Sequence, residues 1–126
     1  MEITNNQIQS LIDKYKNILK LSVWDIFYET INDKNSTEAG SVVNSTYYQL
    51  DIVVNLAEIR DEEHLEKTII HELVHAVVAP YQYLLEECKE QVVNKDFYNV
   101  VADYELENLV THLERVIYNL GKEDVI

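Results

Sequence analysis

Chain-breaking residues are rare in this sequence. Its 126 residues include only 2 glycines and 1 proline, against 9 tyrosines. A β-sandwich or barrel needs many glycine- and proline-rich turns, so these folds are disfavoured. The sequence therefore predicts long helices beside a modest sheet. A single domain spanning residues 1–126 is expected, because domains most often hold about 100–150 residues.

Hydrophobic periodicity predicts the elements of the N-terminal half. Apolar residues recur at helical spacing over 4–20, which indicates an amphipathic helix. Aromatic and β-branched residues occupy both odd- and even-numbered positions over 21–31, which favours a central strand buried on both faces. Turn-forming residues over 32–41 predict a loop or a hairpin connection. Apolar and polar residues then alternate over 48–56, which predicts a strand at or near the sheet edge.

The C-terminal half is predicted to be helical. A helix is expected to begin near Asp61, whose side chain can cap it, and to stop at Pro80, because the residue before a proline avoids helical geometry. A second helical stretch is expected over 82–93. A last helix is expected over 96–120, ending near Gly121. The order of helix, strands and helices predicts the α+β class, with a small mixed sheet.

The composition is acidic, with 10 Lys and Arg against 23 Asp and Glu and a formal net charge of −13. A surface this negative repels phosphate, which disfavours nucleic-acid binding and attraction to an anionic membrane. The single cysteine cannot form an intrachain disulfide, which favours a reducing compartment. The first ten residues lack the pattern of a signal peptide, and no apolar run reaches the roughly 18 residues of a membrane span. A cytoplasmic protein is therefore expected.

The strongest chemical signal is the segment His71–His75, which reads HELVH. Histidines four residues apart lie one helical turn above each other, so each imidazole can give a nitrogen to one metal ion at about 2.0–2.1 Å. Glu72 lies about 100° around the helix, beside the open position, where it can act as a general base. The alternative is a pair of core histidines with a chance glutamate. The apolar flanks favour a metal site with Glu72 as the catalytic residue.

A catalytic zinc ion needs three protein ligands, so a third must come from elsewhere in the chain. The sequence after His75 lacks the glycine and histidine that would complete a metzincin motif. Cys88 is one candidate. The acidic residues Asp103, Glu105 and Glu107 of the last helix are others, since each can sit at the margin of its apolar stripe. Periodicity alone leaves this choice open.

The segment TIIHELVHAVVAP, followed further along by ENLVTHL, resembles the small zincin-type metallopeptidases of phages and bacteria, of the gluzincin kind. In that family the third ligand precedes a pattern E-x-x-V-x-x-L, and Glu107, Val110 and Leu113 stand at these positions. The resemblance also covers a Trp-containing strand, matched by Trp24, and a strand before the active helix, matched by Leu50–Leu56. It implies that Glu107 completes a zinc site with the two histidines.

The resemblance further implies a minimal zincin-like domain that hydrolyses a peptide bond in a peptide or protein substrate. Zinc would activate a water molecule, and Glu72 would accept its proton and pass it to the leaving amine. An extended substrate would pair with the strand Leu50–Leu56, near Asp51 and Asn55. Tyr104 is a candidate for stabilising the oxyanion, with a packed aromatic residue as the alternative.

Two other functions compete with a zinc peptidase. One is a catalytically silent zinc-containing module that binds a peptide or a partner, because a short chain has little room for a walled cleft. The other is a decoy whose acidity mimics nucleic acid. Glu72 favours the enzyme, since a structural zinc takes four protein ligands and uses no general base. Two histidines and a carboxylate also suit iron or manganese, and the oligomeric state stays open.

Overall fold

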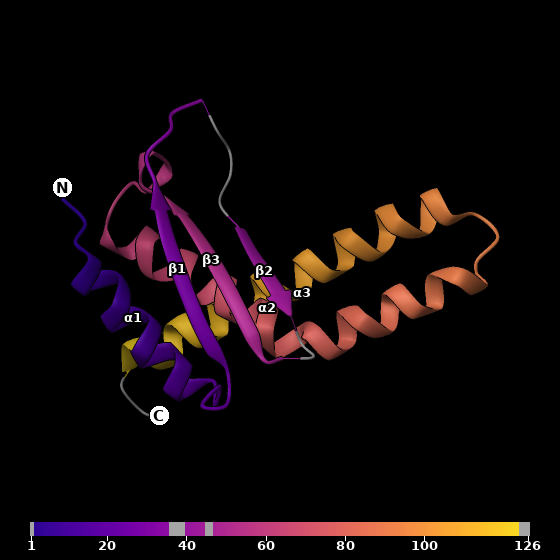
Figure 1. Cartoon of the computed structure of the whole chain (residues 1–126), viewed down its shortest axis with the longest axis horizontal. Helices are drawn as coiled ribbons and strands as arrows, with labels where there is room; N and C mark the ends of the chain where they lie inside the picture. The colour runs from indigo at the N-terminus through magenta and orange to yellow at the C-terminus, as the bar shows by residue number, and fades with distance from the viewer. Residues whose placement is uncertain (1, 36–39, 45–46, 124–126) are drawn as a thin grey trace.

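The computed structural model describes residues 2–35, 40–44 and 47–123, in which helices pack on a small sheet (Figure 1). The α+β class is confirmed. Short 3-10 turns follow the last strand and the second helix, at Leu56–Glu58 (η1) and Lys89–Gln91 (η2). The main elements, in chain order, are α1 (Asn5–Ile18), β1 (Asp25–Ile31), β2 (Gly40–Asn44), β3 (Gln49–Asn55), α2 (Glu62–Cys88) and α3 (Lys95–Glu123).

The sheet is mixed, with the strand order β1-β3-β2. β1 runs parallel to β3, in a register that pairs Asp25 with Gln49, and β2 runs antiparallel to β3. β3 is therefore the central strand and β1 is an edge strand, which is the reverse of the expectation. Apolar alternation reports which face of a strand is buried, but it carries no information about the strand's neighbours.

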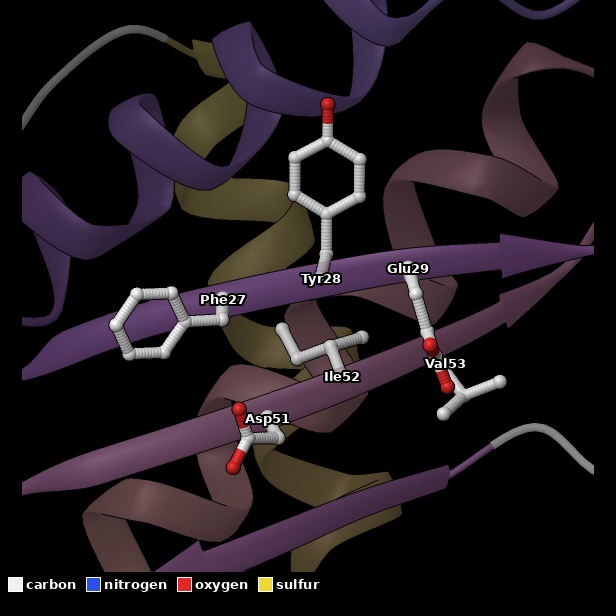
Figure 2. A pocket seen from close by; sticks show the side chains of 6 residues that line it. All are labelled: Phe27, Tyr28, Glu29, Asp51, Ile52 and Val53. Carbon is white, nitrogen blue, oxygen red and sulfur yellow. The ribbon is translucent and has the colours of Figure 1, made fainter.

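One face of the sheet packs on the helices and the other is open. Leu50, Ile52 and Val54 of β3 are fully buried and belong to the core. Phe27 of β1 is 54% exposed, so the expected burial of this strand on both faces is wrong. A pocket of about 270 Å³ lies against β1 and β3, and Figure 2 shows the side chains that line it, among them Phe27 and Asp51.

The expected loop over 32–41 is only partly described. Residues 36–39 lie outside the described residues, and Gly40 and Ser41 already belong to β2. β2 pairs with β3 and not with β1, so the hairpin of this sheet is β2–β3.

The start of α2 agrees with the prediction, but its end does not. Asp61 caps the helix by accepting a hydrogen bond from the backbone N–H of His64 at 2.7 Å. The helix then continues through Pro80 to Cys88, so the break and the separate helix over 82–93 are wrong. The second half of α2 packs against α3, where the Tyr98 hydroxyl donates to the carbonyl of Leu85 at 2.7 Å. Tertiary packing thus outweighs the cost of an internal proline.

α3 also passes the glycine that was expected to end it. The helix continues through Gly121 to Glu123. A Cβ atom at position 121 would lie 2.6 Å from the hydroxyl oxygen of Tyr15, a fully buried residue of α1. Glycine is therefore needed here for the close approach of two helices, and not as a helix terminator.

One cluster of buried apolar side chains joins α1, β3, α2 and α3. α1 itself begins with a capping box, in which the side chains and backbone N–H groups of Thr4 and Gln7 bond reciprocally. Among the described helices, none has the length and apolar character that a membrane crossing requires. Beyond the sheet, the second half of α2 and the first half of α3 run side by side as a projecting arm, residues 77–104 (Figure 1).

Candidate metal centre

The three residues predicted as metal ligands lie together between α2 and α3. One carboxylate oxygen of Glu107 is 3.2 Å from Nε2 of His71, and the other is 3.2 Å from Nε2 of His75. The two imidazole rings lie 5.3 Å apart, edge to face. One donor atom from each residue falls within 4.8 Å of the other two.

These distances fit a single small cation. Two donors that each lie about 2.0–2.1 Å from a tetrahedral zinc ion are roughly 3.3 Å apart. Both distances from Glu107 are 3.2 Å, one from each carboxylate oxygen to one imidazole. The two contacts use different oxygens of Glu107, and the donor atoms of the cluster lie within 4.8 Å of one another, so a bound ion would draw the three side chains closer together.

Local packing explains why the ligands meet. His71 and His75 are separated by one turn of α2, between the buried residues Ile70, Leu73 and Val74. On α3, Leu106 and Val110 are buried on either side of Glu107 in the sequence. The core therefore fixes both helices in rotation and in register, and the ligand positions follow from them.

The other candidates for the third ligand lie outside this cluster. Asp103 and Glu105 are exposed on α3, and Cys88 is an exposed free thiol at the end of α2. The cluster includes none of these three residues. Tyr104, the candidate oxyanion donor, is also exposed, one helical turn before Glu107.

Glu114 belongs to the site and was not predicted. Its Oε1 lies 3.0 Å from Nδ1 of His71, and its side chain is mostly buried. Residues seven apart on a helix lie two turns apart on the same side. The spacing from Glu107 to Glu114 was therefore a usable signal in the sequence.

His71 thus faces a carboxylate at each of its two ring nitrogens. A neutral imidazole has one N–H, so it can donate a hydrogen bond to only one of them. If Nδ1 donates to Glu114, Nε2 turns a lone pair toward Glu107. A cation between that lone pair and the Glu107 carboxylate would satisfy both groups, so the donor set fits a metal ion.

Glu72 is buried beside this centre, with only 6% of its surface exposed. Its side chain lines the same pocket as His71, Thr68 and Glu114, a hollow of about 390 Å³. Arg60, His64 and Lys67 complete the lining. The proposed base, one imidazole and the supporting carboxylate therefore share one solvent-accessible space.

Two polar residues of β3 have roles other than those expected. Asn55 is buried, and its side chain bonds the backbone of Asp33 and Ala57, which makes it a structural residue. Asp51 alternates with the buried residues of β3, so it lies on the open face of the sheet. An added strand cannot pair with β3, because β1 and β2 already occupy both of its sides.

Comparisons with known proteins add no family to this geometry. No protein-family model, no curated protein and no solved structure matches the chain. The resemblance to zincin-type metallopeptidases therefore stays a prediction from the motif residues.

Proposed function

We propose that this protein is a zinc-dependent metallopeptidase. His71, His75 and Glu107 would hold the metal, and Glu72 would act as the general base. One observation carries the proposal: nitrogen and oxygen donors from two helices converge within 4.8 Å, next to a buried glutamate that lines a pocket. Two imidazoles and a carboxylate are a common catalytic zinc set, because they leave a fourth position open.

The metal would supply Lewis acidity, which lowers the pKa of a water molecule to about 7 and polarises a peptide carbonyl. Glu72 would accept the proton of the attacking water at a carboxylate oxygen and deliver it to the leaving amine. Glu114 would hold the ring of His71 in one orientation through its contact with Nδ1.

An extended substrate would pair with β2. This strand is at the sheet edge and contacts α2, the helix that carries both histidines. Figure 1 shows β2 as the strand nearest the arm. An extended peptide added along β2 would gain main-chain hydrogen bonds with little demand on its side chains.

A second candidate function is a catalytically silent, zinc-containing module that binds a partner. The exposed apolar side chains of the arm favour it, because such surfaces mark interaction sites. Both candidates use the same metal ligands. They differ in whether Glu72 performs chemistry.

The test is Glu72→Gln, with Glu86→Gln as a control, because Glu86 is an exposed glutamate on the same helix. Zinc per chain and cleavage of an unfolded protein such as casein are measured for each variant. We expect Glu72→Gln to lose at least about a hundredfold in cleavage rate with its zinc content unchanged, and Glu86→Gln to match the wild type. Full activity of Glu72→Gln would refute the general-base role. Zinc-loaded wild-type protein that cleaves nothing would favour the silent module.

A further inference from the structure

Exposed apolar side chains are concentrated on the arm. Of the fifteen large apolar residues that are exposed in the described part of the chain, eight lie between residues 81 and 104. These eight are Tyr81, Tyr83, Leu84, Val93, Phe97, Val100, Val101 and Tyr104. A soluble monomer does not normally leave so many large apolar groups together in water.

Most of these side chains form two helical stripes. On α2, Tyr81 and Leu84 continue from Val77 at spacings of four and three residues, so all three lie along one side of the helix. On α3, Phe97, Val100, Val101 and Tyr104 are spaced in the same way. The contact between the two helices uses other residues than these stripes. Leu85 and Tyr98 are partly buried at that contact. The two stripes therefore need a cover from outside the arm.

The stripes have the composition of an interface core. Residues 80–85 and 97–102 contain no charged side chain, and the acidic residues of the arm lie beyond these runs. Charged residues are depleted at the centres of protein interfaces, whereas Tyr and Phe are enriched there. The formal charge of −13 disfavours an anionic lipid or nucleic acid as the cover, and it also repels a second copy, but the uncharged runs 80–85 and 97–102 would keep like charges away from the centre of such a contact.

We propose that the arm is a dimerisation surface and that a second copy of this chain covers it. An uncovered aromatic side chain presents about 150–250 Å². At the exposed fractions of the seven stripe residues, including Val77, the arm offers on the order of 700 Å², which approaches the roughly 800 Å² that each partner contributes to a standard stable interface. Two antiparallel helix pairs can associate as a four-helix bundle, the arrangement in which stripes on both helices become interior.

The proposed interface borders the candidate metal centre. Tyr104 lies one turn before Glu107 on α3, and the side chain of Glu107 is 55% exposed. A second copy that covers the α3 stripe would therefore approach the open side of the cluster. Dimerisation through the arm does not depend on zinc or on peptide hydrolysis. A failure of the dimerisation proposal can therefore be distinguished from a failure of the proposed metallopeptidase function.

The test is sedimentation velocity of the full chain over a wide concentration range, with two matched variants. Val100 on the α3 stripe and Val23 before β1 are both valines and both 69% exposed. We expect the wild type and Val23→Glu to be dimers. Val100→Glu should weaken dimerisation about a hundredfold, because a symmetric interface includes the substitution twice and each is expected to cost about tenfold. Circular dichroism checks that the variants fold, and Leu84→Glu on the other stripe replaces Val100→Glu if that variant does not.

Two outcomes would overturn the proposal. A wild-type chain that stays monomeric at the highest concentration would assign the arm to a different protein. A dimer that tolerates both Val100→Glu and Leu84→Glu, or that Val23→Glu disrupts equally, would place the interface elsewhere. Alkylation of Cys88, the single cysteine, gives a second readout of dimerisation. Cys88 is an exposed thiol. It lies eleven residues, or about three turns, beyond Val77, on the same side of α2 as the stripe. Faster alkylation of Cys88 in Val100→Glu than in the wild type would support the proposal, and equal rates would contradict it.

Discussion

Glu114 and His71 lie 3.0 Å apart, through Oε1 of the carboxylate and Nδ1 of the ring. The contact is on the side of the imidazole that faces away from the three-residue cluster, since Nε2 is the nitrogen that approaches Glu107. A carboxylate in this position selects the tautomer with the proton on Nδ1 and leaves Nε2 as a donor for a metal.

Removing this carboxylate should weaken metal binding without removing a ligand. We expect Glu114→Ala to lower zinc affinity about 10–100-fold, because the ring of His71 loses its orientation. Glu114→Gln should recover part of the loss, since an amide oxygen can still accept from Nδ1–H. Competition with a chromophoric chelator measures the affinity. Glu105→Gln is the control, because Glu105 is an exposed acid on the same helix; equal affinities for Glu114→Ala and this control would contradict the positioning role.

Tyr15 should make the fold sensitive to alkali. Its pKa is raised well above the ordinary value of 10.0, mainly by burial, then by its hydrogen bond to the Glu66 carboxylate and by the charge of that group. The folded protein therefore holds this proton to higher pH than the unfolded chain does. The contribution to stability is complete below about pH 10 and is lost as the pH rises beyond it.

Urea unfolding at a series of alkaline pH values measures this effect. The free energy of unfolding should fall with pH in the wild type and fall less steeply in Tyr15→Phe. Some slope should remain, because burial also raises the pKa of Tyr98 and of Tyr118. Identical slopes for the two proteins would show that Tyr15 does not carry the effect.

Gly121→Ala should destabilise the protein, although alanine is the better helix former. In an open helix the exchange would stabilise by up to about 1 kcal/mol. Here the new methyl group would lie 2.6 Å from the Tyr15 hydroxyl, and overpacking of this kind costs about 1–3 kcal/mol. Denaturant unfolding shows whether Gly121→Ala lowers or raises the free energy of unfolding. Asn119→Ala, at an exposed position two residues earlier, is the control and should change stability by less than about 0.5 kcal/mol; a stabilised Gly121→Ala would contradict the close packing of α1 and α3.

Pro80→Ala should stabilise the protein. Pro80 lies inside α2 and is exposed, so replacing it restores a backbone donor without disturbing the core. The free energy of unfolding should rise by at most about 3 kcal/mol, which is the full cost of a proline relative to alanine inside a helix. Thermal unfolding followed by circular dichroism measures it, with Gln82→Ala as an exposed control on the same helix. A lower melting temperature for Pro80→Ala would mean that the proline supports the arm.

Local signals were readable in the sequence, and long-range ones were not. The Asp61 cap and the spacing of His71 and His75 depend on neighbouring residues, and α2 begins and presents both imidazoles as predicted. The strand order depends on pairing between distant segments, so alternation in β3 identified its buried face but not its central place. Local preference predicts helix ends at Pro80 and Gly121, and packing between helices overrides that preference.

The candidate site divides in the same way. Glu72 and the two histidines follow from a motif within five residues. The prediction of Glu107 as the third ligand depends on the resemblance to zincin-type metallopeptidases. Only the packing of α3 against α2 decides which acidic residue of the last helix approaches the imidazoles. Glu114 needed the same packing, and its spacing of seven residues from Glu107 becomes informative once that residue is placed.

The central claim is that one divalent ion binds between α2 and α3. The most direct measurement is the anomalous difference density at the zinc edge in crystals of the protein grown with zinc. The account predicts one strong peak per chain within about 2.0–2.2 Å of Nε2 of His71, Nε2 of His75 and a carboxylate oxygen of Glu107. Saturating zinc with no density at this position, or density only at other surface acids, would contradict it.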